Sequence, residues 1–315
     1  MKSKALVTGC AGFIGSHLAE RLINEGFEVV GVDCFLDYYP REIKEKNIEN
    51  LRKNEKFHFI EANILDIDLK PWLKNVDYVF HQAAQAGVRA SWGENFKIYT
   101  DNNILATQML LEACKDINLK KFVYASSSSI YGDIKELPMK ENMRPRPISP
   151  YGVSKLAGEH LCYLYWKNFG IPTVSLRYFT VYGPRQRPDM AFHKFIKAML
   201  HGEKITIYGD GKQTRDFTYV SDIVEANLLA ATSEIEGEVL NIGGGSRISL
   251  IETIHILEEI IGKEAKIEYM ETQKGDMKDT YADISKAKKI LDYSPKVEIK
   301  NGLEKEVEWI KKVYT

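Results

Sequence analysis

The chain has little that would tie it to a membrane, to nucleic acid or to a metal ion. No apolar run reaches the roughly 20 residues that a membrane-spanning helix needs. The 43 basic and 44 acidic residues give a formal net charge of −1, so no excess of positive charge favours nucleic acid or an anionic surface as partner. The four cysteines have no CxxC or CxxxH spacing, which argues against both a zinc site and a disulfide framework.

What remains is a chain of 315 residues, 44% of them hydrophobic, which is enough for one large domain or two coupled lobes. Residues 6–8 are expected to belong to the first strand of the fold, so we expect no signal peptide before it. We also expect a cytoplasmic location.

Short apolar runs alternate with helical patterns through the first 180 residues, as is typical of a parallel sheet with crossover helices. The expected strands are 4–8, 28–32, 57–61, 78–81, 122–126 and 173–177. The expected helices between them are 13–24, 95–116 and 151–168. This alternation predicts an α/β fold with a doubly wound parallel sheet, the Rossmann arrangement.

The pattern changes after residue 177 and predicts a smaller, interleaved C-terminal α/β lobe. It contains a helix at 191–200, a strand at 204–208 and, from residue 250 onward, helices alternating with loops. A helix from about residue 222 and the apolar run 239–242 are expected to return to the first lobe. We therefore expect a dinucleotide-binding domain at 1–177 with 216–245, and a substrate-binding lobe at 178–215 and 246–315.

Three glycines, Gly9, Gly12 and Gly15, follow the first strand and open the first helix. In this context they give a tight turn, a close approach of a pyrophosphate to backbone N–H groups, and close packing of helix on strand. Asp33 ends the second strand, where a carboxylate accepts hydrogen bonds from ribose hydroxyls and repels a 2′-phosphate, so NAD is favoured over NADP. Arg41 and Lys44 follow and are expected to be solvated.

Later strand ends supply the rest of the predicted cofactor site. Asn63 and Ile64 suit the adenine edge, and small side chains follow the fourth strand, whereas His81 is expected to be a packed or capping residue. The cofactor-binding residues expected from the sequence are Gly9, Gly12, Phe13, Ile14, Gly15, Asp33, Asn63, Ile64, Ala83 and Ala84.

Tyr151 and Lys155 are four residues apart and share one face of a helix. An ammonium beside a phenol is expected to lower the phenol pKa from about 10 towards the working range of a general base. A serine-rich strand end at 126–129 lies upstream. Together with the glycine turn, these features predict the redox site of a nicotinamide-dependent enzyme.

Five segments carry a resemblance that covers most of the chain: DYYP at 37–40, AAQAGVRASW at 83–92, ASSSSIYG at 125–132, YFTVYGPRQRPDMA at 178–191 and RDFTY at 215–219. The chain resembles the extended short-chain dehydrogenase/reductase superfamily of sugar-nucleotide epimerases and dehydratases. Within it, the chain is most similar to UDP-glucuronate 4-epimerases. A 4,6-dehydratase is disfavoured, because residues 128–129 are serines where that chemistry needs an acid–base pair.

The resemblance implies NAD-dependent epimerisation at C4 of a UDP-hexuronic acid through a 4-keto sugar, with Ser127, Tyr151 and Lys155 as the catalytic group. It adds Asn102 to the cofactor site, where Lys155 also binds the nicotinamide ribose. Arg215 is expected to bind the diphosphate, and Gln213 and Asp276 the uridine or its ribose. No metal is implied.

Thr180 stands where many relatives that act on neutral sugars have asparagine. With Ser128, Ser129 and Arg187 it makes a polar nest suited to a carboxylate. The alternative interpretation is that the serines cap backbone groups at the strand end. The alternatives left open are a UDP-glucuronate decarboxylase, a UDP-glucose 4-epimerase and, more remotely, a non-catalytic NAD-binding regulatory protein.

The helices 95–116 and 151–168 carry long apolar faces. The resemblance implies that such helices form the seam of a homodimer, but from the sequence they fit a buried core equally well. The side chains concerned are Leu110, Leu111, Leu161, Leu164 and Trp166.

Overall fold

A parallel sheet forms the centre of the molecule. The computed structural model describes residues 3–314; Met1, Lys2 and Thr315, at the ends of the expected lobes, lie outside the described residues. Within them, seven strands are ordered β11-β6-β5-β4-β1-β2-β3, with every neighbouring pair parallel. The strands are β1 (Lys4–Thr8), β2 (Glu28–Asp33), β3 (Phe57–Glu61), β4 (Tyr78–His81), β5 (Lys121–Ser127), β6 (Thr173–Tyr178) and β11 (Glu238–Ile242).

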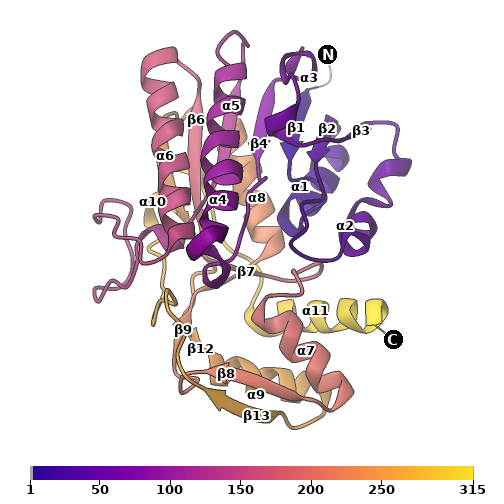
Figure 1. The fold of residues 1–315 in the computed structure, drawn as a ribbon, viewed down its shortest axis with the longest axis vertical. Helices are drawn as coiled ribbons and strands as arrows, with labels where there is room; N and C mark the ends of the chain where they lie inside the picture. The colour runs from indigo at the N-terminus through magenta and orange to yellow at the C-terminus, as the bar shows by residue number, and fades with distance from the viewer. Residues whose placement is uncertain (1–2, 315) are drawn as a thin grey trace.

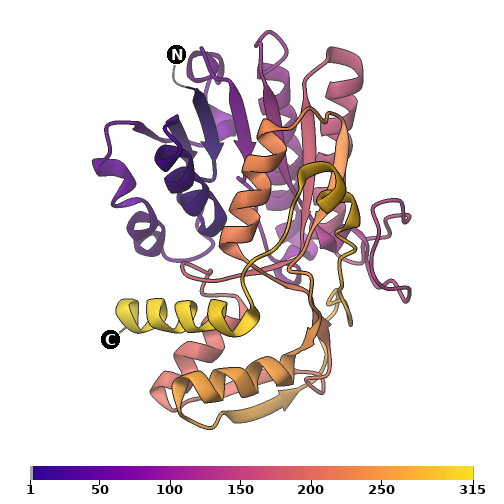
Figure 2. The ribbon, with the colours of Figure 1, turned by 180° about the vertical axis from the view of Figure 1, so that it is seen from behind.

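Helices cover both faces of this sheet, which is why its central strands are apolar on both sides. α1 (Phe13–Asn24) packs on α8 (Val220–Thr232) over one face, and α5 (Ala106–Ala113) packs on α6 (Pro150–Phe169) over the other. Figure 1 shows α5 and α6 on the near face, and Figure 2 shows α8, in orange, on the opposite face. The predicted doubly wound α/β fold is confirmed.

Local signals set the ends of α6, the helix that carries Tyr151. The Ser149 hydroxyl caps its first turn by accepting a hydrogen bond from the Gly152 N–H, and Pro150 occupies the first helical position. Gly170 ends it with φ of 70°, a left-handed conformation that glycine adopts without strain. The first turn is thereby fixed at the end of β5.

The expected helix at 95–116 is not continuous. It consists of α4 (Phe96–Tyr99), a π-helical segment, η5 (Thr100–Leu105), and α5. A π-turn inserts an extra residue into the helical repeat, so the side chains before and after it face differently from a regular helix. Hydrophobic spacing did not reveal this change.

The second lobe lies below the sheet in Figure 1, beyond the carboxyl ends of the strands. It contains α7 (Ala191–His201), β8 (Lys204–Tyr208), α9 (Leu250–Ile261), β13 (Lys266–Met270) and α11 (Ile299–Tyr314). β13 pairs in parallel with β8, so the expectation of only helices and loops after residue 250 was wrong. β13 has only five residues and is largely exposed, so its alternation of polar and apolar residues is too short to be told from a loop.

Shorter elements connect the two parts. Two small strand pairs cross between them, β7 (Thr180–Tyr182) with β10 (Phe217–Tyr219) and β9 (Thr214–Arg215) with β12 (Ile248–Ser249). The remaining helices are α2 (Arg41–Ile48), α3 (Lys70–Leu73) and α10 (Ser285–Leu291), with short 3-10 turns at η1 (Leu51–Lys53), η2 (Ile64–Asp66), η3 (Arg89–Ser91), η4 (Gly93–Asn95) and η6 (Ser128–Ile130). Across residues 3–314, no helix is long and apolar enough to cross a membrane.

Candidate active site

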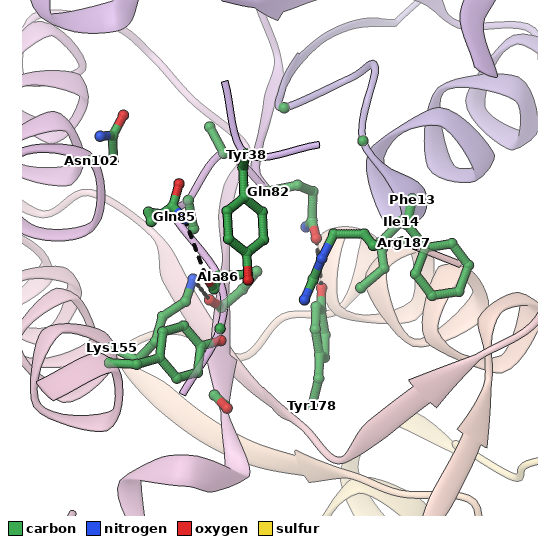
Figure 3. Close-up of a pocket in the computed structure, with 18 of the residues that line it drawn as sticks. Phe13, Ile14, Tyr38, Gln82, Gln85, Ala86, Asn102, Lys155, Tyr178 and Arg187 are labelled. Atoms are coloured by element: carbon green, nitrogen blue, oxygen red, sulfur yellow. Dashed lines mark hydrogen bonds between the residues drawn. The ribbon is translucent and has the colours of Figure 1, made fainter. Parts of the chain in front are cut away.

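A cavity of about 450 Å³ lies at the carboxyl edge of the sheet, between the two lobes. Its walls come from the segments that follow β1, β2, β4, β5 and β6, and from the second lobe as far along the chain as Met277. This is where ligands bind in open α/β folds. Figure 3 shows the interior of this cavity, with Lys155 on one side and Phe13 on the other.

The glycine turn closes one end of the cavity. Gly9 has φ of 70°, and a Cβ there would come within 2.7 Å of the Ala83 nitrogen. A Cβ on Gly15 would collide with the Gly9 carbonyl oxygen. The backbone is therefore packed too tightly for side chains, and the first N–H groups of α1 remain available to a pyrophosphate, as a dinucleotide requires.

Asp33 lies beside this turn at the end of β2 and lines the cavity. Its carboxylate accepts hydrogen bonds from the backbone N–H groups of Ala11 (3.0 Å) and Phe35 (2.8 Å). Burial raises the pKa of Asp33, and these two hydrogen bonds oppose the shift. The carboxylate is thus held in one orientation, with acceptor capacity left for ribose hydroxyls.

The other residues predicted to bind the cofactor also line the cavity: Gly12, Phe13, Ile14, Asn63, Ile64, Ala83, Ala84 and Asn102. The Asn63 side chain is partly engaged, since its Oδ1 accepts a hydrogen bond from the Leu65 N–H. His81 is buried between Thr8 and Thr107, with a pKa lowered to about 3 by burial, so it is a packed residue as expected.

The expectation for Lys44 was wrong. Its side chain is buried, its ammonium donates to the Leu36 carbonyl oxygen and it lies 4.5 Å from the centre of the Tyr39 ring. Burial lowers its pKa, which the Asp33 charge opposes. The sequence pattern around Lys44, a short and polar helix, did not indicate burial. Lys44 is buried because residues 34–40 fold back over α2.

Tyr151 and Lys155 both line the cavity, from the first turns of α6. The Lys155 ammonium donates to the Ala125 carbonyl oxygen at 2.8 Å, and burial lowers its pKa to about 7. Burial also raises the pKa of Tyr151, and the groups that oppose this shift are the Ser127 hydroxyl and the Arg187 charge. Lys155 is not among the groups that lower the phenol pKa, so the expected coupling between its ammonium and the phenol is not seen.

The serine-rich strand end has two different roles. The Ser127 hydroxyl accepts a hydrogen bond from the Ser129 N–H at 3.1 Å and so caps the turn that follows β5. The hydroxyls of Ser128, Ser129 and Thr180 form no hydrogen bond with any described residue, although all three residues line the cavity. They are available to a polar ligand group.

A buried ion pair holds this strand end against α6. The Arg177 guanidinium on β6 donates to both Glu159 carboxylate oxygens, at 3.0 and 2.5 Å. The Ser126 hydroxyl donates to the same carboxylate at 2.8 Å. Because Glu159 lies one turn beyond Lys155, this network fixes both the helix and the residue next to Ser127.

Arg215 lines the cavity from the second lobe. Its guanidinium donates to the carbonyl oxygens of Thr214, Met277 and Lys278, and burial lowers its pKa. It does not pair with the following Asp216, whose carboxylate accepts backbone hydrogen bonds from Gly244 and Ala282. Because the hydrogen-bond partners of the Arg215 guanidinium are neutral carbonyl oxygens, its positive charge remains available to attract an anion.

The other two predicted uridine-site residues differ in position. Asp276 lines the cavity but forms an ion pair with Arg89, at 2.6 Å from the guanidinium Nη2 to the carboxylate. Gln213 is not part of the cavity lining within residues 3–314, and its amide donates to the Tyr208 carbonyl oxygen. The ion pair between Arg89 and Asp276 was not predicted, because the two residues are far apart in the sequence.

Asn103, rather than Asn102, carries the buried hydrogen bonds of the helix behind the site. Its side chain accepts from the Gln85 N–H at 2.7 Å and donates to the Gln85 carbonyl and the Ser154 hydroxyl. Asn102 donates only to the Ile98 carbonyl oxygen one turn earlier. The π-helical segment places Asn103 against Gln85 and Ser154 and leaves Asn102 at the cavity wall, and no sequence signal marked this difference.

A second group that the sequence did not reveal links the ends of β4 and β6 to α8. The Tyr178 hydroxyl contacts the Gln82 amide oxygen at 3.2 Å and the Asn227 side chain, and Gln82 and Tyr178 both line the cavity (Figure 3). Gln82 follows β4, Tyr178 ends β6 and Asn227 lies on α8, so the group connects two strand ends with the helix that covers them.

The fold and this constellation define a nicotinamide-dependent enzyme acting on an extended, polar ligand. A family model described as the NAD dependent epimerase/dehydratase family matches residues 5–243, and the chain belongs to that family. The predicted family, enzyme class and NAD dependence are confirmed.

Individual relatives are similar over nearly their whole lengths. The chain is 52% identical to the UDP-glucuronic acid 4-epimerase of Bacillus cereus, whose crystal structure holds UDP-glucuronic acid and NAD, with a TM-score of 0.96 over 99% of this chain and 100% of that one. It is 44% identical to the UDP-glucuronate 4-epimerase of Thermodesulfobacterium geofontis, over 97% and 95% of the two chains. It is 47% identical to YtcB of Bacillus subtilis, named an uncharacterized UDP-glucose epimerase, over 99% of each.

Proposed function

We propose that this protein is a UDP-glucuronate 4-epimerase, which interconverts UDP-glucuronate and UDP-galacturonate with NAD. The observation that carries the proposal is the group of Ser128, Ser129, Thr180 and Arg187, which line the same cavity as Tyr151 and the glycine turn. Three free hydroxyls and a guanidinium suit a sugar carboxylate.

Bound NAD supplies the hydride acceptor and donor at C4 of the sugar. Tyr151, as the phenolate, takes the proton of the C4 hydroxyl as the alcohol becomes a ketone, and the resulting phenol returns that proton when the alcohol re-forms. Ser127 hydrogen-bonds the same sugar oxygen. The ketone must present both faces in turn, so the UDP group has to be held firmly while the hexose ring rotates.

Arg215 is the proposed diphosphate anchor, because it supplies a partly buried positive charge at the second-lobe side of the cavity. Asp276 and Gln213 belong to the same proposal as contacts for the uridine part. Gln213 reaches the ligand only if its hydrogen bond to the Tyr208 carbonyl oxygen is exchanged.

The carboxylate raises a chemical difficulty, since oxidation at C4 turns a hexuronate into a β-keto acid. Such an acid loses CO2 when its C5–C6 bond lies parallel to the carbonyl π-system. The hydroxyls of Ser128, Ser129 and Thr180, with Arg187, are placed to hold the carboxylate out of this alignment. In this proposal, restraint of the sugar carboxylate is what distinguishes an epimerase from a decarboxylase.

The test is to incubate the purified protein, without added NAD, with UDP-glucuronate and to follow the mixture by NMR. UDP-galacturonate without CO2 is the expected result, and it also requires that NAD stay bound through turnover. UDP-pentose with CO2 would make the protein a decarboxylase and overturn the proposed grip. Absence of any conversion of UDP-glucuronate, both without NAD and after NAD is added, would overturn the proposed substrate.

UDP-glucose is the second candidate substrate, favoured by the name of the Bacillus subtilis relative. A neutral hexose leaves the Arg187 charge without a ligand partner, so we expect the ratio kcat/KM to favour UDP-glucuronate. Measuring kcat/KM for both sugars with one protein preparation decides between them.

We further propose a homodimer in the cytoplasm. Leu110 and Leu111 are buried in the core, but Ile98, Leu105, Val153 and Leu164 are 42%, 47%, 45% and 49% exposed on the helices of the near face in Figure 1. Large apolar side chains gathered on two adjacent helices are typical of an association surface. Cys10, Cys34, Cys114 and Cys162 are all unpaired, which fits a reducing compartment.

A further inference from the structure

We propose that Asp189 sets how strongly the enzyme prefers a charged sugar over a neutral one, by acting as the internal counterion of Arg187. The inference rests on the proposed function, because it assigns Arg187 to the sugar carboxylate. It concerns a different residue, however, and a different property: the ratio of the affinities for two substrates.

The Arg187 guanidinium is engaged along one side only. Its Nε donates to the Asp189 Oδ1 at 2.9 Å, and its Nη2 donates to Oδ2 at 3.1 Å. A guanidinium has five N–H donors in a planar fork. Two are used by Asp189, so three remain for a ligand in the cavity that Arg187 lines.

Tyr38, from the first lobe, holds the carboxylate side of this pair. Its hydroxyl donates to the Asp189 Oδ2 at 3.1 Å, and its ring centre lies 5.7 Å from the Arg187 guanidinium carbon. A Cβ on Gly87 would collide with the Tyr38 hydroxyl, so the ring is packed against a glycine on its other side. Figure 3 shows Tyr38 and Arg187 together inside the cavity.

These contacts give a structural reason for the DYYP segment at 37–40. Tyr38 belongs to that segment, whereas Arg187 and Asp189 belong to the segment at 178–191. The three side chains join the two lobes beside the cavity, whose lining includes Tyr38 and Arg187. Asp189 is therefore held from both sides, by Arg187 and by Tyr38.

The charge on Asp189 has opposite consequences for the two kinds of substrate. For UDP-glucose, the paired Arg187 leaves no uncompensated cation when the sugar displaces water from the cavity. For UDP-glucuronate, the Asp189 carboxylate lies close to the incoming carboxylate and offsets part of the attraction to Arg187. Asp189 thus narrows the difference between the two affinities, and removing its charge should widen that difference.

The experiment measures dissociation constants of UDP-glucuronate and UDP-glucose for the NAD-loaded protein by calorimetry. All proteins carry Tyr151→Phe, so that turnover does not disturb binding. With Asp189→Asn, we expect the ratio of Kd for UDP-glucose to Kd for UDP-glucuronate to rise roughly fivefold to tenfold. Asp189→Glu, which keeps the charge, should leave the ratio close to that of the parent protein.

Two controls separate this electrostatic role from a structural one. Asp77→Asn makes the same chemical change in an ion pair with Lys120, next to the amino end of β4 and outside the cavity lining, and should leave the ratio unchanged. In an Arg187→Met background, Asp189→Asn should widen the preference much less, because it then relieves only the direct repulsion between Asp189 and the sugar carboxylate and unmasks no cation. Asp189→Ser serves as the second charge-removing variant if the asparagine protein does not fold.

An unchanged or lower ratio in the folded, NAD-loaded Asp189→Asn or Asp189→Ser protein would overturn the inference. So would an equal rise in the Arg187→Met background. These outcomes differ from failure of the proposed function, which is shown by absence of UDP-galacturonate in the turnover assay of the unmodified enzyme. The binding ratio is measured without turnover and tests Asp189 in either case.

Discussion

Tyr151 and Lys155 occupy surroundings that hold water away from both side chains. Lys155 is buried against Tyr124 and the Ala125 carbonyl oxygen, and Tyr151 is half-buried at the cavity wall with its ring 6.2 Å from that of Tyr99. Burial disfavours the ammonium and the phenolate alike, since each is the charged form of its group. Both charged forms are therefore destabilised here, and a bound ligand group of opposite charge would stabilise them.

The lowered pKa of Lys155 predicts that the free energy of unfolding, measured without added NAD, depends on pH. The pKa of Lys155 is lowered from 10.5 to about 7 in the folded state, so between these values the unfolded chain binds more protons. The free energy of unfolding, relative to that of Lys155→Met, should rise from about pH 7 towards pH 10, by on the order of a few kcal/mol. Urea unfolding at several pH values measures it, with the exposed Lys53→Met as control. A pH-independent difference would mean that Lys155 remains charged when buried.

Thr180→Val tests the proposed carboxylate grip at a single hydroxyl. The substitution keeps the shape of the side chain but removes an oxygen that lines the cavity and has no partner among the described residues. We expect UDP-pentose and CO2 to appear at roughly a tenth of the epimerisation rate, since the keto acid is held less firmly. NMR of the product mixture measures this. Thr232→Val, at the exposed end of α8, should give no pentose.

At the scale of elements, the position of α6 against β5 decides where Tyr151 and Lys155 lie. Gly158 allows this approach, because a Cβ there would collide with the Tyr124 hydroxyl on β5. The Glu159–Arg177 ion pair then fixes the helix laterally. A small residue and a buried ion pair, rather than a broad apolar stripe, set this contact.

Gly158→Ala brings two effects into opposition. Alanine is favoured over glycine inside a helix by about 1 kcal/mol. Overpacking against Tyr124 opposes this gain and is the larger effect, so we expect the free energy of unfolding to fall by about 1–2 kcal/mol and turnover to fall with it. Urea unfolding and NMR turnover assays check both. Adding Tyr124→Phe, which removes the colliding oxygen, should restore part of the loss, and a net gain in stability would show that α6 can shift.

The elements of the sheet were predictable because strands buried on both faces leave nearly continuous apolar runs. The apolar run 239–242 predicted the last strand, β11, and the glycine turn predicted the cofactor end of the cavity. By contrast, the burial of Lys44, the inward turn of Asn103 and the Arg89–Asp276 pair depend on a folded-back loop, a π-turn and contacts distant in sequence. Such features have no local pattern, so the sequence could not indicate them.

At the scale of the whole molecule, the loop after β7 is tied to both lobes. Arg185 donates to Glu20 on α1 at 2.7 Å, and the Gly183 N–H donates to the buried Glu306 carboxylate on α11 at 2.8 Å. The loop also carries Arg187 and Asp189. The cavity is thus shaped by the first and the last helices of the chain together.

The proposed dimer gives a prediction at this scale. Leu105→Glu with Leu164→Glu places two charges on the apolar surface of the near-face helices, where burial of an unpaired charge is strongly unfavourable. We expect the variant to sediment at the monomer mass, whereas the unmodified protein sediments as a dimer. Tyr269→Glu, on the exposed β13 of the second lobe, is the matched control and should remain a dimer. A monomeric unmodified protein would refute the proposal.

The strand order has a consequence for synthesis on the ribosome. β6 pairs with β11 on one side, yet β11 is translated only after α7, β8 and α8. Until it emerges, the nascent chain presents an open, apolar sheet edge at β6, the kind of surface that recruits other unfinished chains. Slow decoding between residues 179 and 237 would lengthen that exposure. The yield of folded protein should then depend on the codons of this segment and on chaperones that bind exposed strands.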